Sequence, residues 1–332
     1  MTRVLRKCLP LILILLLSAS CGRRSSNKNQ QSPTSYRNFP MPSVPALYNA
    51  PEARAEYLSA NMWGQFMSLS DSRTDTLYML GVPREQVEKC VGMWISFLNM
   101  IPLNQAQKDI DKLFTSLETH MKAHPEDSLF YLRYTEMICS YMYDPNSPLR
   151  DEDLFLPFVK RLASSVYTRE DMRPGYEYQA LMCSRNQRGS LAPDFKYTTA
   201  SGRRGSLYGI KADYTLIMFS NPGCTSCREI ISGLCSRPYI STGMTGKQVK
   251  VLNLYIDEEV NKWREYLPEY PTNWINAYEH KGVIRGEQIY DVRAIPSLYL
   301  LDADKHILMK DAPLERVLGY LDTQLGLMTN TQ

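Results

Sequence analysis

The sequence of 332 residues has little that would suit it to cross a membrane or to bind nucleic acid. Its nearly unbroken aliphatic run extends only from Leu9 to Leu17, whereas a membrane-spanning helix needs about 20 residues. The formal net charge of +3 is too small to indicate a nucleic acid partner. With 44% hydrophobic and 22% charged residues, the composition is that of an ordinary globular protein.

Metal and phosphate sites are not indicated either. Of the four histidines, only His120 and His124 are spaced to share one face of a helix, and two histidines alone make a poor metal site. The adjacent Pro125 favours an exposed helix end for this pair. Between Gly202 and Gly209 the chain lacks the Gly-Lys-Ser/Thr ending of a phosphate-binding loop. The sequence therefore predicts no metal site and no phosphate loop.

What the N-terminus does have is the pattern of an export signal. A basic lead, the aliphatic run and a few small residues precede Cys21. The stretch Ser18–Cys21 resembles a bacterial lipobox, although Ser18 stands where leucine is usual. The resemblance implies a lipid on Cys21, which would be a durable membrane anchor; cleavage without lipid is the alternative. We expect a signal peptide over residues 1–20 and a flexible tether over residues 21–45, where apolar residues are too few to form a core.

Apolar residues recur at spacings of three and four along several segments between residues 46 and 186. They predict helices from Arg84 to Met100, through Ile110–Met121, from Pro125 through Ile138, and over Asp151–Val166 and Glu170–Met182. Such stripes are more often the core of a helical bundle than a cofactor site. We therefore predict an all-α domain over residues 46–186.

Two cysteines lie where a strand is expected to turn into a helix. The apolar run Thr215–Phe219 is typical of a buried strand, Asn221–Gly223 breaks it, and a helical pattern begins at Arg228, directly after Cys224 and Cys227. Unpaired N–H groups and the helix dipole favour a thiolate over a thiol at such a position. Because a thiolate is the nucleophile in disulfide exchange, the pair predicts redox chemistry. A structural disulfide in an inactive fold is the alternative.

A second motif, Ile295-Pro296-Ser297, precedes the strand-like run Leu298–Leu301. Together with Cys224 and Cys227 it resembles the thioredoxin fold, and within that fold the membrane-anchored thioredoxin-like proteins of the TlpA group. The resemblance covers roughly residues 192–328 and implies an α/β thioredoxin-like fold for residues 187–332. It also implies that the Ile295–Pro296 bond is cis, faces the disulfide and helps to bind the extended backbone of a partner.

The resemblance has further consequences on either side of these motifs. The helical domain resembles domains of unknown function that precede thioredoxin folds in bacterial lipoproteins, which implies an architecture but no activity. Met218 stands where thioredoxin has a buried acid, so Glu229 is the nearest substitute. The stretch Glu265–Gly286 is longer than a minimal thioredoxin needs, and we expect an insertion there.

Four further cysteines, Cys90, Cys139, Cys183 and Cys235, lie in apolar helical patterns and are predicted to be buried thiols. If they were paired among themselves, three connectivities would be possible. Cys235 follows Cys227 by eight residues, so a resolving role is a second hypothesis for this thiol.

These observations favour a lipid-anchored thiol-disulfide oxidoreductase that faces the periplasm of a Gram-negative bacterium. Its redox group would be the Cys224–Cys227 disulfide with no other cofactor, and its partners would be protein thiols and disulfides and a membrane electron donor. Thr225 and Ser226 between the cysteines leave open whether it reduces, oxidises or isomerises. The alternative is a redox-inactive adaptor whose helical domain binds a partner.

Overall fold

A computed structural model of the chain describes residues 37–71, 73–241, 248–279 and 281–327. The predicted signal peptide (1–20), the predicted lipid site at Cys21 and most of the predicted tether (21–45) lie outside these residues. In the part of the chain that is described, no helix is both long and apolar enough to cross a membrane.

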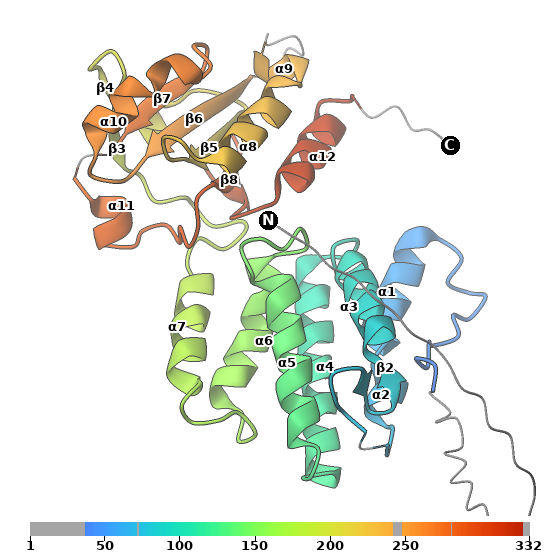
Figure 1. The fold of residues 1–332 in the computed structure, drawn as a ribbon. Coiled ribbons are helices and arrows are strands. Elements are labelled where there is room, and N and C mark those ends of the chain that lie inside the picture. Colours follow the sequence, from blue (N-terminus) through green and yellow to red (C-terminus); the bar gives the residue numbers. More distant parts are fainter. Residues whose placement is uncertain (1–36, 72, 242–247, 280, 328–332) are drawn as a thin grey trace, which may run out of the picture. The chain divides into compact units, whose positions relative to one another are not determined.

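The first part of the described chain, up to Cys183, is helical (Figure 1). We call it the helical region. Its helices are α1 (Pro51–Asn61), α2 (Gly64–Met67), α3 (Arg84–Leu98), α4 (Leu103–Ala123), α5 (Ser128–Met142), α6 (Glu152–Ser164) and α7 (Arg173–Cys183), with a small hairpin of β1 (Tyr78–Met79) and β2 (Val82–Pro83) before α3. The five helices from α3 to α7 were predicted from their apolar stripes, and the all-α character of this region is confirmed.

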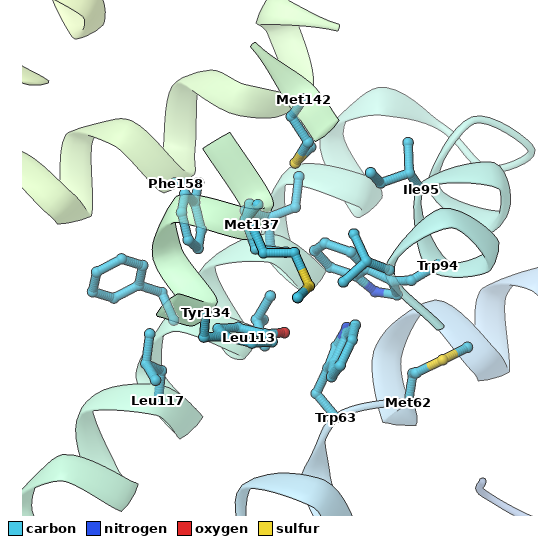
Figure 2. Close-up of a cluster of buried hydrophobic side chains, with 14 of the residues drawn as sticks. Met62, Trp63, Trp94, Ile95, Leu113, Leu117, Tyr134, Met137, Met142 and Phe158 are labelled. Atoms are coloured by element: carbon cyan, nitrogen blue, oxygen red, sulfur yellow. The ribbon is translucent and has the colours of Figure 1, made fainter. Parts of the chain in front are cut away.

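Aliphatic, methionine and aromatic side chains together fill the core of the helical region (Figure 2). Trp63 lies edge-on to Trp94 at 5.8 Å between ring centroids and to Tyr134 at 5.4 Å. The Trp94 indole donates to the carbonyl oxygen of Ser59 at 2.9 Å, so its one polar atom is satisfied inside the core. Burial of such large side chains stabilises this region, since each removes a large apolar area from water.

His120 does not lie at an exposed helix end, so that prediction was wrong. Its side chain is fully buried; Nε2 lies 2.9 Å from an Asp127 carboxylate oxygen and Nδ1 lies 2.9 Å from the carbonyl oxygen of Met67. Both ring nitrogens are therefore used within the protein. His124 remains about a third exposed.

From Lys196 onward the chain forms one mixed seven-stranded sheet with helices packed on it (Figure 1). We call the sheet and these helices together the thioredoxin-like region. The strands lie in the order β4-β3-β7-β6-β5-β8-β9, with bounds β3 (Lys196–Thr199), β4 (Arg204–Ser206), β5 (Tyr214–Phe219), β6 (Val249–Tyr255), β7 (Ile275–Tyr278), β8 (Ser297–Leu301) and β9 (Ile307–Met309). Strand β5, next to the central strand β6, is parallel to β6 and antiparallel to β8. The strands predicted at Thr215–Phe219 and Leu298–Leu301 are confirmed as β5 and β8.

Side chains of β5 alternate between two apolar layers, as the pleat of a strand requires. Leu216 and Met218 pack on one face with side chains of α8 (Thr225–Cys235) and α12 (Leu314–Gln324), while Ile217 and Phe219 pack on the other. Three shorter helices, α9 (Pro238–Ser241), α10 (Val260–Glu265) and α11 (Val283–Gly286), and the 3-10 turns Leu207–Gly209 and Leu267–Glu269 complete the described elements. The α/β thioredoxin-like fold is thus confirmed.

The stretch Glu265–Gly286, expected to be an insertion, contributes strand β7 to the interior of the sheet. Strand β7 pairs with β6 in parallel and with β3 in antiparallel orientation. Its Asn276 is accommodated by Asn253 on β6, which donates to the Asn276 side-chain oxygen at 3.0 Å. Because polar Asn276 lies within this short strand, the sequence shows no continuous apolar run there and did not indicate a strand.

Candidate functional site

The site forms where two neighbouring strands meet at one edge of the sheet. In the antiparallel pair of β5 and β8, Phe219 lies opposite Ser297. Strand β5 therefore ends where β8 begins, which brings the loop after Phe219 and the residue before Ser297 to the same edge. Cys224 follows on the first of these segments, and Pro296 ends the second.

Cys224 is the N-cap residue of α8, and Cys227 lies in its first turn. Gly223 before them has φ +76°, a conformation that glycine adopts without steric cost, and it turns the chain from β5 into the helix. The backbone N–H of Cys227 donates to the Cys224 sulfur at 3.1 Å. The two cysteines form a disulfide with their Cα atoms 5.2 Å apart.

The two sulfurs differ in access. Cys227 is buried, with 1% of its surface exposed, whereas Cys224 is half-buried. An external thiol or disulfide can therefore reach only the Cys224 sulfur. After reduction, that sulfur would sit among the unpaired N–H groups of the helix start, which stabilise a thiolate.

The Ile295–Pro296 peptide bond is cis, as the resemblance implied. Ile295 packs against the apolar layers on both faces of the sheet, including the layer that contains Cys224 and Cys227. Ser226 of α8 and Pro296 line one groove of about 390 Å³. Cys224, Cys227, Ile295 and Pro296, singled out in the sequence, thus lie together at one edge of the sheet.

The carboxylate expected to serve this site is placed differently from the acid of thioredoxin. Met218 is fully buried in the layer that contains Cys227. Glu229 is exposed and lines the groove beside Pro296. Glu229 is therefore in solvent contact and does not replace a buried carboxylate beneath the disulfide.

One solved structure agrees with this architecture over most of the chain. A thioredoxin-like protein from Bacteroides caccae is 34% identical, with a TM-score of 0.72; the match covers 89% of this chain and 100% of the other. The chain belongs to the thioredoxin-like proteins. The C-terminal domain of an uncharacterized protein from Bacteroides fragilis (44% identity, TM-score 0.39) and a conserved protein of unknown function from the same species (33%, TM-score 0.39) each match over 41% of this chain and over 97% and 98% of their own length.

The first part of this thioredoxin-like protein matches a second family. Residues 20–182 fit the family model of DUF5106, a domain of unknown function. A comparison with curated proteins found no match. The family match spans the helical region but assigns it no activity.

The other described cysteines, Cys90, Cys139, Cys183 and Cys235, are free thiols. Cys90 and Cys183 are buried as predicted and Cys139 is half-buried, but Cys235 is exposed at the end of α8, contrary to the prediction. Burial raises the pKa of the Cys90 thiol to about 11 and that of Cys139 to about 12, and it raises the pKa of Cys183 and Cys235 as well. These cysteines are therefore poor nucleophiles near neutral pH.

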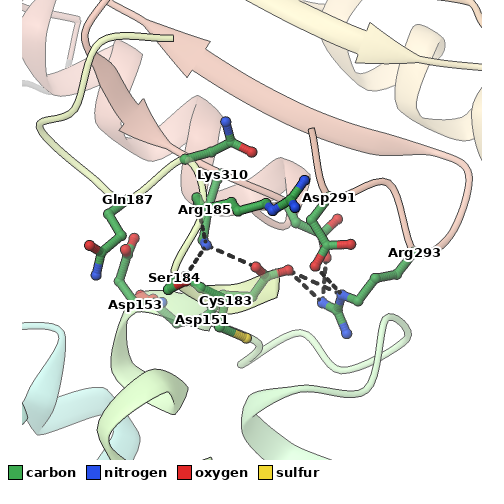
Figure 3. A network of polar contacts seen from close by, with 12 residues as sticks. Asp151, Asp153, Cys183, Ser184, Arg185, Gln187, Asp291, Arg293 and Lys310 are labelled. Carbon is green, nitrogen blue, oxygen red and sulfur yellow. Dashed lines mark hydrogen bonds and ion pairs between the residues drawn. The ribbon is translucent and has the colours of Figure 1, made fainter. Parts of the chain in front are cut away.

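Sequence reasoning missed a buried ionic network that links the helical region to the loop before Pro296 (Figure 3). Arg293, three residues before Pro296, donates to Glu152 of α6 at 3.1 Å and to Asp311 at 2.7 Å, and it also donates to the carbonyl oxygen of Tyr143. The sequence signal for this network is the acidic stretch Asp151–Asp153 at the start of α6.

Lys310 is the second cation of this network. Its ammonium lies 3.0 Å from Glu152 and donates to the carbonyl oxygens of Cys183 at 2.7 Å and Arg185 at 2.8 Å. The ammonium, whose side chain is 1% exposed, thus makes two hydrogen bonds to carbonyl oxygens and one ion pair with Glu152. Burial nevertheless raises the pKa of Glu152 to about 7, against the effect of Lys310 and Arg293.

Proposed function

We propose that this thioredoxin-like protein is a thiol-disulfide oxidoreductase that exchanges disulfides with partner proteins through Cys224 and Cys227. The observation that supports this most directly is the unequal exposure of the two sulfurs at the start of α8. One sulfur is open to a partner and the other is held behind it, 5.2 Å away between Cα atoms. A purely structural disulfide needs no such asymmetry beside an open groove.

The reaction has two exchange steps when the reduced chain meets a partner disulfide. The Cys224 thiolate attacks one partner sulfur; a mixed disulfide forms, and the other partner sulfur leaves as a thiolate. The Cys227 thiolate then attacks the Cys224 sulfur, which closes the Cys224–Cys227 disulfide and releases the second partner thiolate. Two electrons pass to the partner, and a dithiol reductant must return the chain to its starting state.

Ile295 and Pro296 hold the partner during these steps. The groove beside Ser226 reaches both residues, so a segment that delivers its sulfur to Cys224 passes along them. Proline has no N–H to donate, which leaves the partner's backbone free to lie across this point without competition from a local hydrogen bond.

We also propose that the protein belongs to the TlpA group and is held on a membrane, facing the periplasm, by a lipid on Cys21. The basic lead, the short aliphatic run and the small residues before Cys21 support this placement. A membrane protein would then supply the electrons. Labelling of Cys21 by a radioactive fatty acid in cells, with Cys21→Ser as the control, tests the anchor.

The enzymatic proposal is tested by trapping. Cys227→Ser leaves Cys224 without its resolving partner, so mixed disulfides with partner proteins should accumulate and should disappear on reduction. Cys224→Ser should trap none, and Cys235→Ser, which changes an exposed thiol outside the pair, should behave as wild type. If Cys227→Ser traps no partner and the wild type does not reduce the disulfides of insulin, the enzymatic proposal is wrong and the adaptor hypothesis gains support.

A further inference from the structure

We propose that the loop Asp144–Arg150 of the helical region, between α5 and α6, forms one wall of the groove that receives the partner's cysteine-bearing segment. The helical region would then take part in choosing the partner. This inference rests on the proposed function, because it concerns the same groove. It adds a specificity element that lies outside the thioredoxin-like region.

The groove beside the disulfide has walls from two distant parts of the sequence. Ser226, Glu229 and Ile230 of α8 and the Ile295–Pro296 bond line one side. Pro145, Asn146, Pro148 and Arg150 of the loop also line it. Asn146 and Pro148 are exposed, so their side chains are available to a bound segment.

The loop is held in shape by its own hydrogen bonds. The Ser147 hydroxyl donates to the carbonyl oxygen of Tyr141 at 2.6 Å, and the Asn146 N–H donates to the Asp144 carboxylate at 2.8 Å. The N–H of Asp151 donates to the carbonyl oxygen of Met142 at 2.9 Å, which closes the base of the loop. A wall that is already ordered loses little conformational entropy when a partner binds.

The loop is also fastened to the thioredoxin-like region. Arg150 donates to the carbonyl oxygen of Asp311 at 2.8 Å, and its Nε lies 3.5 Å from the Asp311 carboxylate. Arg293 stacks over the Tyr143 ring, with 3.8 Å from its Cζ to the ring centroid, and bonds the same Asp311 carboxylate. Arg293 lies three residues before Pro296, on the other side of the groove from Arg150. Both arginines bind Asp311, so this carboxylate supports the two sides of the groove.

The lining combines prolines and aliphatic side chains with polar ones, which suits an extended segment with both kinds of side chain. Pro145, Pro148, Pro296 and Pro313 line the groove and lack backbone donors, while Ile230 and other aliphatic side chains supply apolar surface. A peptide in extended conformation can lay alternate side chains into such a groove and keep its remaining polar groups in water.

The charge of the lining indicates a basic residue near the partner's cysteine. Glu229 and Glu315 both line the groove and are exposed, and neither makes an ion pair with a described residue. The cation in the lining, Arg150, is instead engaged by Asp311. The groove therefore suits a partner polypeptide segment that carries a lysine or arginine beside its cysteine.

The experiment compares three disulfides with the reduced full-length protein. One is 2-hydroxyethyl disulfide, which is too small to contact the loop. The other two are short disulfide-linked peptides that differ only in a lysine or a glutamate beside the cysteine. Wild type should reduce all three, and it should reduce the lysine peptide faster than the glutamate peptide.

Asn146→Trp places a large side chain in the groove and should slow both peptides by about tenfold or more, with the small disulfide unchanged. Pro148→Trp repeats the test at a second exposed position. Glu170→Trp is the matched control on an exposed loop away from the groove and should change none of the rates. Glu229→Gln combined with Glu315→Gln should remove the preference for the lysine peptide.

The outcomes separate this inference from the proposed function. If wild type reduces all three disulfides but both tryptophan variants slow every substrate equally, or slow none, the loop is not a wall of the binding groove. If the double glutamine variant keeps the lysine preference, the basic partner is wrong. If wild type does not reduce even the small disulfide, the proposed function fails, and this inference fails with it.

Discussion

At the scale of single residues, Arg293 connects the most groups around the site. Its planar guanidinium meets two carboxylates, a carbonyl oxygen and an aromatic ring, while 12% of its side chain is exposed. Burial alone would lower its pKa, but Glu152 and Asp311 raise it above the usual value. Several fixed donors in one plane make this geometry accessible to arginine and inaccessible to lysine.

Arg293→Met should therefore destabilise the protein by about 3–5 kcal/mol, because it leaves Glu152 and Asp311 buried without one of their cations. Arg293→Lys should recover little of this loss, since one ammonium cannot reach all the acceptors. Urea unfolding followed by circular dichroism measures both changes.

Arg169 provides the matched control. It pairs with Asp171 at 2.6 Å, but the two side chains are 65% and 63% exposed. Arg169→Met should leave the stability nearly unchanged, as is usual for surface pairs. Equal losses for Arg293→Met and Arg169→Met would mean that the buried network does not contribute to stability.

At the scale of elements, regular spacing of large apolar residues decided what the sequence could predict. Helix α4 buries Ile110, Leu113 and Leu117 along one face, and it was predicted. Helix α1 was not predicted. It buries only Ala55, Leu58 and Ser59, and so short an apolar stripe resembles that of a loop. The site motif was predicted because Cys224 and Cys227 are close together in the sequence and lie between a recognisable strand and helix.

The groove wall and the ionic network could not be predicted in the same way. The contacts of Arg293 with Tyr143 and Glu152 join residues 150 and 141 positions apart. No local pattern specifies which distant charges will meet, because the pairing depends on how the helical region packs against the thioredoxin-like region. Long-range polar contacts of this kind appear only once the fold is known.

The apolar stripe of α4 leads to a prediction about packing. Leu117 is fully buried, so Leu117→Ala should destabilise the protein by about 2–5 kcal/mol through lost burial and the cavity left behind. Leu129→Ala in α5 is the matched control, because that side chain is 43% exposed, and it should change stability by about 0.5 kcal/mol or less. The midpoint of urea unfolding distinguishes them, and similar shifts for both would contradict the assigned core.

At the scale of the whole molecule, the helical and thioredoxin-like regions are joined by charges rather than by apolar surface alone. The described residues belong to one compact unit. At the joint, Asp151 caps the start of α6 and also lies 2.8 Å from Arg188. Burial would raise the pKa of Asp151, but Arg316 and Arg188 hold it below the usual value. The pKa of the neighbouring Glu152 is shifted in the opposite direction, upward. The stability of the contact between the two regions should therefore depend on pH.

The pKa of Glu152 is raised from 4.5 to about 7 by burial, although Lys310 and Arg293 act to lower it and Asp291 and Asp311 act to raise it. The folded protein therefore holds this proton more tightly than the unfolded chain. The resulting contribution to stability is fully present below pH 4.5 and is lost as the pH rises through about 7. The total effect is at most about 3 kcal/mol.

Glu152→Gln removes this titration. The stability of wild type relative to the Gln variant should fall steadily between pH 5 and pH 8, as measured by urea unfolding at several pH values. Subtracting the two curves cancels the groups common to both proteins, including the histidines. Glu56→Gln, at an exposed position of α1, is the matched control. A flat curve for Glu152→Gln, or one that rises with pH, would mean that the carboxylate stays ionised throughout and that the two cations outweigh its burial.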